Sequence, residues 1–155
     1  MRLLVHTSPH IPHLAGAWSA RELLPWYNRC VSIVGIGVDA VDVAVMRETI
    51  ARTPSIVTRC FTESERSYAQ RARDPSERFA VRFAAKEAVM KAMGVGLGAF
   101  AFYDVEVARA ENGVPSLVVT GAAATLAAER GVSRWLVSLT HTELVAIAYV
   151  VAERD

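Results

Sequence analysis

Carboxylates and cations occur at three places in the sequence with the types and spacing needed to hold a hard metal ion and a phosphate. Asp39 ends the run Gly35–Asp39, in which two glycines allow another group to approach the backbone closely. The run lacks the third glycine of the dinucleotide-binding pattern GxGxxG. An aspartate after a strand is more commonly a helix N-cap than a metal ligand, and the two roles are compatible.

Glu87 and Lys91 are the second group. They are four residues apart, so on a helix they share one face, whereas Lys86 points elsewhere. Such a pair is most often a surface ion pair that contributes about 0.3–0.5 kcal/mol. Alternatively, Arg82 and Lys91 present two cations near one carboxylate, ahead of the glycine-rich stretch 94–98. This grouping suits a polyphosphate bridged to the protein by Mg²⁺, which keeps waters and uses one or two carboxylates.

His141 is the third candidate. It ends a predicted strand and is flanked by the hydroxyl residues Ser138, Thr140 and Thr142, which can donate to phosphate oxygens. A lone histidine at a strand end is more often structural. Adjacency in sequence does not establish a Ser-His-Asp triad, because a triad is recognised by geometry.

Composition limits the classes of function. The chain has 155 residues, 52% of them hydrophobic, which predicts one folded domain. A net charge of +1 does not suggest a nucleic-acid partner. Cys30 and Cys60 lie in no CxxC or Cys/His pattern, so neither a disulfide framework nor a zinc site is expected, and a reducing cytoplasm is the expected location. No stretch reaches the roughly 20 apolar residues that span a bilayer, so no membrane partner is expected.

Periodicity and turn residues predict the elements that would position these side chains. We expect a strand at 33–39, a helix at 41–52, a helix that begins at Thr62 with Glu65 completing a capping box, and a long helix at 75–93. A hairpin at 103–108 and 116–120, a helix at 122–130 and strands at 135–140 and 145–152 follow. This order predicts an α+β domain with a mostly antiparallel sheet.

Together, and in this order, the three motifs resemble those of the holo-acyl-carrier-protein synthase family, the small bacterial type of 4′-phosphopantetheinyl transferase. The helix motif Arg82–Ala88, followed by Lys91 and the glycines, is the most specific part. The resemblance spans residues 32–153 and includes further segments: Arg59 with Phe61-Thr62, and 104–107 with 112–115. It implies a phosphopantetheinyl transferase-like fold in which the sheet packs on a long central helix. It also implies a homotrimer with sites at subunit interfaces, in which Asp39 and Lys91 come from different chains.

The same resemblance implies the reaction. The enzyme would transfer 4′-phosphopantetheine from coenzyme A to a serine of an apo acyl carrier protein, with Mg²⁺ as cofactor, and release adenosine 3′,5′-bisphosphate in fatty acid or polyketide biosynthesis. Asp39 and Glu87 would bind the metal, and Lys91 would complete the catalytic group and stabilise the leaving phosphate. The implied nucleotide-binding residues are Arg82, Lys91, Gly94, Gly96, Ser138 and His141.

The acidic carrier protein would contact a basic surface formed by Arg47, Arg52 and Arg59, although Val45 stands where relatives often have a basic residue. One alternative is a non-catalytic module that binds coenzyme A or a nucleotide on the same fold, which would tolerate loss of Glu87 and Lys91. Another is a small structural or interaction domain, which would show no metal-dependent nucleotide binding.

Residues 1–31 are expected to form an N-terminal extension to a domain at 32–155. His6, His10 and His13 do not form a convincing metal site, because Pro9 and Pro12 prevent a helix from aligning them. One hypothesis is that translation starts at Val31. A native N-terminal peptide that contains Trp18 or Trp26 would refute it.

Overall fold

The computed structural model describes residues 32–110 and 112–155. The predicted extension, its three histidines and Cys30 lie outside these residues. In chain order the elements are β1 (Ser32–Asp42), α2 (Val43–Arg52), α3 (Ser55–Cys60), α4 (Glu63–Ala69), α5 (Pro75–Ala92), the 3₁₀ turn η1 (Phe102–Asp104), β2 (Val105–Arg109), β3 (Pro115–Val119), α6 (Gly121–Glu129), β4 (Arg134–His141) and β5 (Val145–Arg154).

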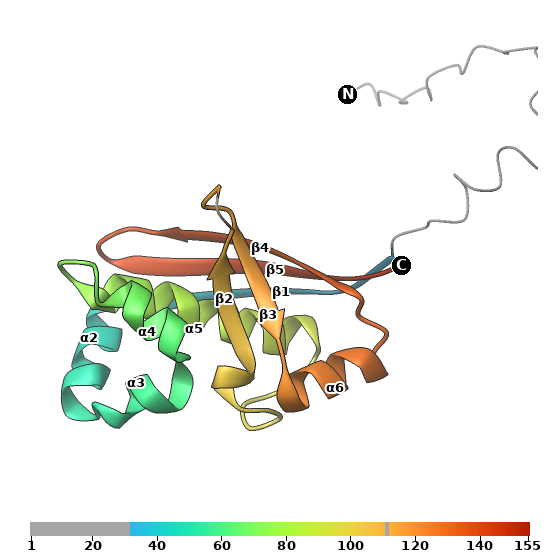
Figure 1. Ribbon diagram of the computed structural model, residues 1–155, viewed down its shortest axis with the longest axis horizontal. Helices are drawn as coiled ribbons and strands as arrows, with labels where there is room; N and C mark the ends of the chain where they lie inside the picture. The colour runs from blue at the N-terminus through green and yellow to red at the C-terminus, as the bar shows by residue number, and fades with distance from the viewer. Residues whose placement is uncertain (1–31, 111) are drawn as a thin grey trace, which may run out of the picture. The chain divides into compact units, whose positions relative to one another are not determined.

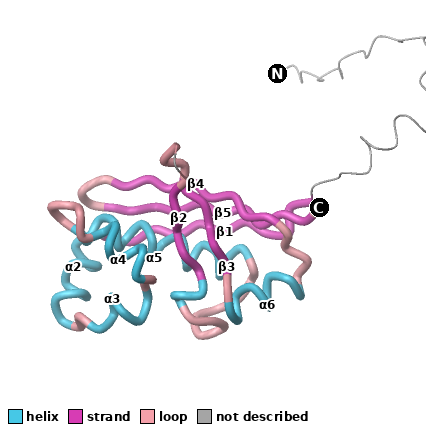
Figure 2. Tube along the Cα trace, in the orientation of Figure 1, coloured by secondary structure: helices cyan, strands magenta, loops and turns pink. Residues whose placement is uncertain are grey.

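The strands form two antiparallel sheets. One has the order β1-β5-β4 and the other is the hairpin β2-β3. The helices lie on one side of the three-stranded sheet (Figure 1). The short hairpin runs across the long strands near the middle of α5 (Figure 2). The predicted α+β class and its antiparallel pairing are therefore confirmed.

β1 and α5 meet at unusually close range because β1 presents glycines to the helix. A Cβ atom added to Gly35 would lie 1.8 Å from the carbonyl oxygen of Ala92, and one added to Gly37 would lie 1.8 Å from that of Ala88. Alternate residues of a strand face the same way, so Asp39 continues this row toward α5. The two glycines thus bring the strand that carries Asp39 directly onto the helix that carries Glu87 and Lys91.

The ends of α5 follow the sequence signals. Asp74 caps the helix by accepting a hydrogen bond from the backbone N–H of Ser76 at 2.9 Å, and Pro75 occupies the first turn. At the other end Gly94 has φ +65°, and the backbone N–H of Val95 donates to the carbonyl of Met90 at 3.0 Å. This Schellman arrangement ends the helix within one residue of the prediction and begins the glycine-rich stretch.

Elsewhere the structure both confirms and corrects the predicted elements. Thr62 and Glu65 form the predicted capping box at the start of α4. β1 continues beyond Asp39 to Asp42, and Asp42 caps α2 by accepting from the backbone N–H groups of Ala44 and Val45. The interpretation of Asp39 as a helix N-cap is therefore wrong. Helix α3 was not predicted.

Two groups of buried side chains form the core. One packs small residues of α5 against the three-stranded sheet, the hairpin and α6, and the other joins α2, α3 and α4 to the first half of α5. Within residues 32–110 and 112–155, no helix is long and apolar enough to cross a membrane.

Candidate active site

Asp39, Glu87 and Lys91 come together within one chain. Asp39 is buried on the α5 side of β1, and its Oδ1 lies 2.7 Å from Nζ of Lys91. Lys91 leaves the last turn of α5 and leans back toward Asp39, as helical side chains do. The expectation that Asp39 and Lys91 come from different subunits is wrong for this pair.

Glu87 lies one turn before Lys91 and is half-buried. Its burial raises the pKa of the carboxyl group, the negative charge of Asp39 raises it further, and the ammonium of Lys91 lowers it in part. The pKa of Lys91 is raised, mainly by its hydrogen bond to Asp39. A carboxylate whose negative charge raises the pKa of its neighbour, as that of Asp39 does for Glu87, forms with it a site that favours a cation.

The residues present fit a magnesium ion. No group of three or more His, Cys, Asp or Glu side chains is placed to hold a metal among the residues that the structure describes. Mg²⁺ requires fewer protein ligands, because it keeps several waters and binds one or two carboxylates together with substrate phosphates. Asp39 and Glu87 supply that number, and the ammonium of Lys91 already neutralises part of their charge.

The other predicted nucleotide-binding residues fall into separate places. Arg82 and His141 line one cavity of about 410 Å³. Lys91 and Gly94 line another cavity of about 410 Å³ beside Gly35. The expectation that Arg82 and Lys91 flank one carboxylate is therefore not met within one chain.

Ser138 and His141 lie on opposite faces of β4. Ser138 pairs with Tyr149 on the exposed outer face of the sheet. His141 faces α5, and its Nδ1 is 3.7 Å from Oε2 of Glu77. Gly96 is exposed in the stretch that follows α5. A single chain therefore leaves the predicted nucleotide-binding residues in three groups.

The three arginines predicted to contact a protein partner differ in the groups that lie beside them. Arg47 is 2.5 Å from Asp74, the N-cap of α5, and Arg52 is 3.5 Å from Glu48 on the same helix. Arg59 is exposed at the rim of an apolar cavity of about 460 Å³ that includes Ile56 and Phe83. All three lie on the consecutive helices α2 and α3 (Figure 1).

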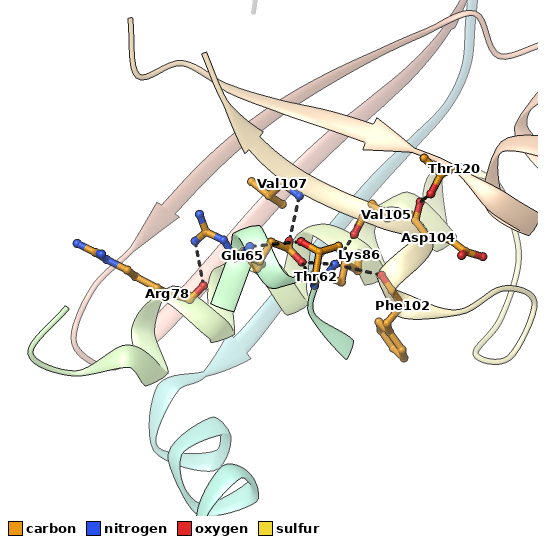
Figure 3. Close-up of polar contacts among 10 residues, drawn as sticks. Thr62, Glu65, Arg78, Lys86, Phe102, Asp104, Val105, Val107 and Thr120 are labelled. Atoms are coloured by element: carbon orange, nitrogen blue, oxygen red, sulfur yellow. Dashed lines mark hydrogen bonds and ion pairs between the residues drawn. The ribbon is translucent and has the colours of Figure 1, made fainter. Parts of the chain in front are cut away.

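Sequence reasoning missed the buried ion pair that holds α5. Nζ of Lys86 lies 2.8 Å from Oε2 of Glu65, and both side chains are fully buried. Lys86 also donates to the carbonyl oxygens of Phe102 and Val105, and the other carboxylate oxygen of Glu65 accepts from the N–H of Val107 at 3.0 Å. Figure 3 shows this network joining α4, α5 and β2. Burial lowers the pKa of Lys86, and Glu65 opposes that shift.

Comparisons with known proteins identify related sequences over most of the chain. A family model described as the 4′-phosphopantetheinyl transferase superfamily matches residues 35–150. A holo-[acyl-carrier-protein] synthase of Frankia casuarinae is 47% identical over 123 residues, which cover 79% of this chain and 99% of that relative.

Solved structures of holo-[acyl-carrier-protein] synthases are similar to this chain as well. The synthase of Neisseria meningitidis has a TM-score of 0.73 at 32% identity and covers 79% of this chain and 100% of its own. The synthase of Bacillus anthracis in complex with CoA (3′,5′-ADP) has a TM-score of 0.66 at 32% identity and covers 79% and 98%. The synthase of Helicobacter pylori in complex with coenzyme A has a TM-score of 0.67 at 27% identity and covers 76% and 98%.

Proposed function

Because the chain belongs to the 4′-phosphopantetheinyl transferase superfamily, we propose that it transfers 4′-phosphopantetheine from coenzyme A to a serine of an apo acyl carrier protein. The serine oxygen forms a bond to the β-phosphorus, the bond from that phosphorus to the bridging oxygen breaks, and adenosine 3′,5′-bisphosphate leaves. The observation that supports this best is the meeting of Asp39, Glu87 and Lys91 in one chain. Fatty acid or polyketide biosynthesis is the pathway that consumes the product.

Asp39 and Glu87 would hold a magnesium ion. When bound, such an ion neutralises phosphate charge and orients the phosphorus. Lys91 supplies a cation beside the leaving phosphate, and its exposed side chain can turn from Asp39 toward a ligand. A water held by Glu87 is a candidate to accept the serine proton.

Arg82, His141, Ser138, Gly94 and Gly96 would hold the nucleotide. Because one chain leaves them in separate groups, we propose that the site is completed across a subunit interface in a homotrimer. Arg47, Arg52 and Arg59 would meet the acidic carrier protein on the surface formed by α2 and α3. The free, buried thiol of Cys60 is consistent with the cytoplasmic location expected from the sequence.

The transfer itself is tested by the intact mass of an apo acyl carrier protein after incubation with the enzyme, coenzyme A and Mg²⁺. We expect a gain of one phosphopantetheine, which a chelator abolishes. Glu87→Gln should slow transfer by about 100-fold or more, the scale of losing one electrostatic contact in a phosphoryl-transfer site. The exposed Glu129→Gln serves as the matched control. Tight coenzyme A binding without transfer to several carrier proteins would instead favour a non-catalytic module.

The raised pKa of Glu87 predicts how divalent cation binding depends on pH. Protons compete with the cation for this carboxylate, so Mg²⁺ affinity should fall as the pH decreases. Because the pKa is raised, the fall should begin at a higher pH than for an ordinary glutamate. Lys91→Met removes the charge that lowers this pKa, so the loss should begin at a still higher pH. Calorimetric titration with Mg²⁺ across the pH range measures both effects. An unchanged pH profile in Lys91→Met would contradict the proposed coupling.

The outer face of the three-stranded sheet supports the homotrimer. Exposed apolar side chains gather there from all three strands: Ile36, Val38, Leu136, Ile147 and Tyr149. A contiguous apolar surface of this kind is typical of a protein–protein contact. A second copy of the chain is the occupant we propose.

Val38 and Tyr149 are paired across β1 and β5. The double variant Val38→Lys with Tyr149→Lys should dissociate the proposed trimer. Wild-type protein is expected at three times 16.9 kDa by light scattering, and the double variant at the mass of one chain. Val118→Lys, an exposed apolar position on the other sheet, should leave the mass unchanged. A wild-type protein that elutes as a single chain at micromolar concentration would refute the trimer.

A further inference from the structure

A pair of opposite charges lies among apolar side chains on the outer face of the three-stranded sheet, the face away from the helices (Figure 1). Arg134 of β4 and Glu153 of β5 are directly opposite each other in the antiparallel pairing, and Nε of Arg134 lies 3.0 Å from Oε2 of Glu153. Alternate residues of a strand face the same way, so Glu153 shares this face with Ile147 and Tyr149. The pair therefore belongs to the surface on which we placed the contact between copies.

Exposed apolar side chains flank the pair on both neighbouring strands. Ile33, which is paired with Glu153 across β1 and β5, is 62% exposed. Leu136, the next outer-face residue after Arg134 on β4, is 41% exposed. The apolar surface thus continues as far as the charged pair and does not end before it. A partner that covers these exposed apolar side chains would cover the pair as well.

One carboxylate oxygen of Glu153 has no hydrogen bond within the part of the chain that the structure describes. The side chain is only 12% exposed, and its Oε2 is buried without a hydrogen-bond partner. The 3.0 Å contact with Arg134 is close enough for an ion pair but lacks the geometry of a hydrogen bond. Buried polar atoms are nearly always hydrogen-bonded. The open acceptor therefore indicates a donor that a single chain does not supply.

We propose that Arg134 and Glu153 form a polar recognition element in the contact between copies of this chain. The pair becomes buried when the copies assemble, and Oε2 of Glu153 accepts a hydrogen bond from the neighbouring copy. The inference rests on the homotrimer of the proposed function. A face that carries one cation and one anion is complementary to a second copy, because each copy offers both a donor and an acceptor. An acidic partner would instead place like charge against Glu153.

Dissociation of the assembly on dilution, followed by sedimentation velocity, tests the proposal. Glu153→Gln and Arg134→Met each leave one charge without its partner, which is strongly destabilising where the pair is buried. Each single variant should raise the concentration at which half of the protein is dissociated by about 100-fold or more. The double variant Arg134→Met with Glu153→Met removes both charges, and its midpoint should lie within about 10-fold of wild type. Circular dichroism checks that every variant is folded.

Glu48→Gln is the matched control, because Glu48 forms an ion pair with Arg52 on α2 in which both side chains are largely exposed. It should leave the dissociation midpoint unchanged. Midpoints of the two folded single variants within about 3-fold of wild type would overturn this inference and leave the trimer in place. A wild-type protein that is a single chain at micromolar concentration would refute the trimer and this inference together. The proposed transfer is judged separately, from the mass of the carrier protein.

Cysteine labelling locates the pair independently of affinity. Ile33→Cys places a thiol beside Glu153, and a maleimide should reach it at least about 10-fold more slowly in the assembled protein than in the variant that also carries Val38→Lys and Tyr149→Lys. Val118→Cys, on the other sheet, should react at the same rate in both backgrounds. The label is counted relative to the chain without the added cysteine. Equal rates at Ile33→Cys in the two backgrounds would place the pair outside the contact and overturn the proposal.

Discussion

Replacing Lys86 by methionine is expected to lower the free energy of unfolding by about 3–5 kcal/mol, because it leaves the carboxylate of Glu65 charged and buried without its partner. Methionine fills a similar volume, so the loss reports the uncompensated charge and the two carbonyls that Lys86 bonds. Urea unfolding followed by circular dichroism, at a fixed protein concentration, measures the change.

Lys91→Met is the matched control for this prediction. It makes the same chemical change on the same helix, but the side chain of Lys91 is 53% exposed. We expect a change of no more than about 1 kcal/mol, as for exposed ion pairs. The double variant Lys86→Met with Glu65→Gln removes both charges and should recover part of the loss. Equal destabilisation by Lys86→Met and Lys91→Met would show that burial of the pair is not what matters.

Gly37→Ala is expected to prevent the native packing of β1 on α5. The added Cβ would lie 1.8 Å from the carbonyl oxygen of Ala88 and 2.8 Å from the backbone nitrogen of Ala92. These are backbone atoms, so no rotamer change can relieve the overlap, and the strand must separate from the helix. We expect a loss of more than about 4 kcal/mol, at the upper end of single substitutions.

Thermal unfolding and the dispersion of amide NMR signals would measure this effect. Gly96→Ala is the control for stability, because a Cβ at that position meets nothing within 4 Å. Gly35→Ala, whose Cβ would lie 1.8 Å from the carbonyl oxygen of Ala92, should behave like Gly37→Ala. A melting temperature of Gly37→Ala within about 2 °C of wild type would contradict the predicted overlap, given the shift per kcal/mol of a domain of this size.

Strong local signals account for the elements that could be predicted from the sequence. Thr62 with Glu65, Pro75 and Gly94 each carry a mechanism that begins or ends a helix, and the structure uses all of them. Helix α3 has no comparable signal, because its six residues include the β-branched Ile56, Val57 and Thr58 and are too few to show a period. Asp39 and Asp42 could not be told apart as caps, since either could follow a strand.

The shared face of Glu87 and Lys91 was predictable from their spacing on a helix, whereas the contact of Asp39 with Lys91 within one chain was not. The rest of the site was not predictable from spacing. Charged residues are seldom fully buried, so nothing in the sequence distinguished Lys86 and Glu65 from solvated residues. Arg82 and His141 come from different elements, and only the fold places them at one cavity.

The backbone contact between β1 and α5 also bears on the thermodynamics of ligand binding. Main-chain atoms, and not rotamers, fix how far the strand that carries Asp39 lies from the helix that carries Glu87. A cation that binds both carboxylates therefore orders two short side chains and no backbone segment. Because conformational entropy lost on binding subtracts from affinity, the affinity of this pair depends mainly on charge and desolvation, with little penalty for ordering.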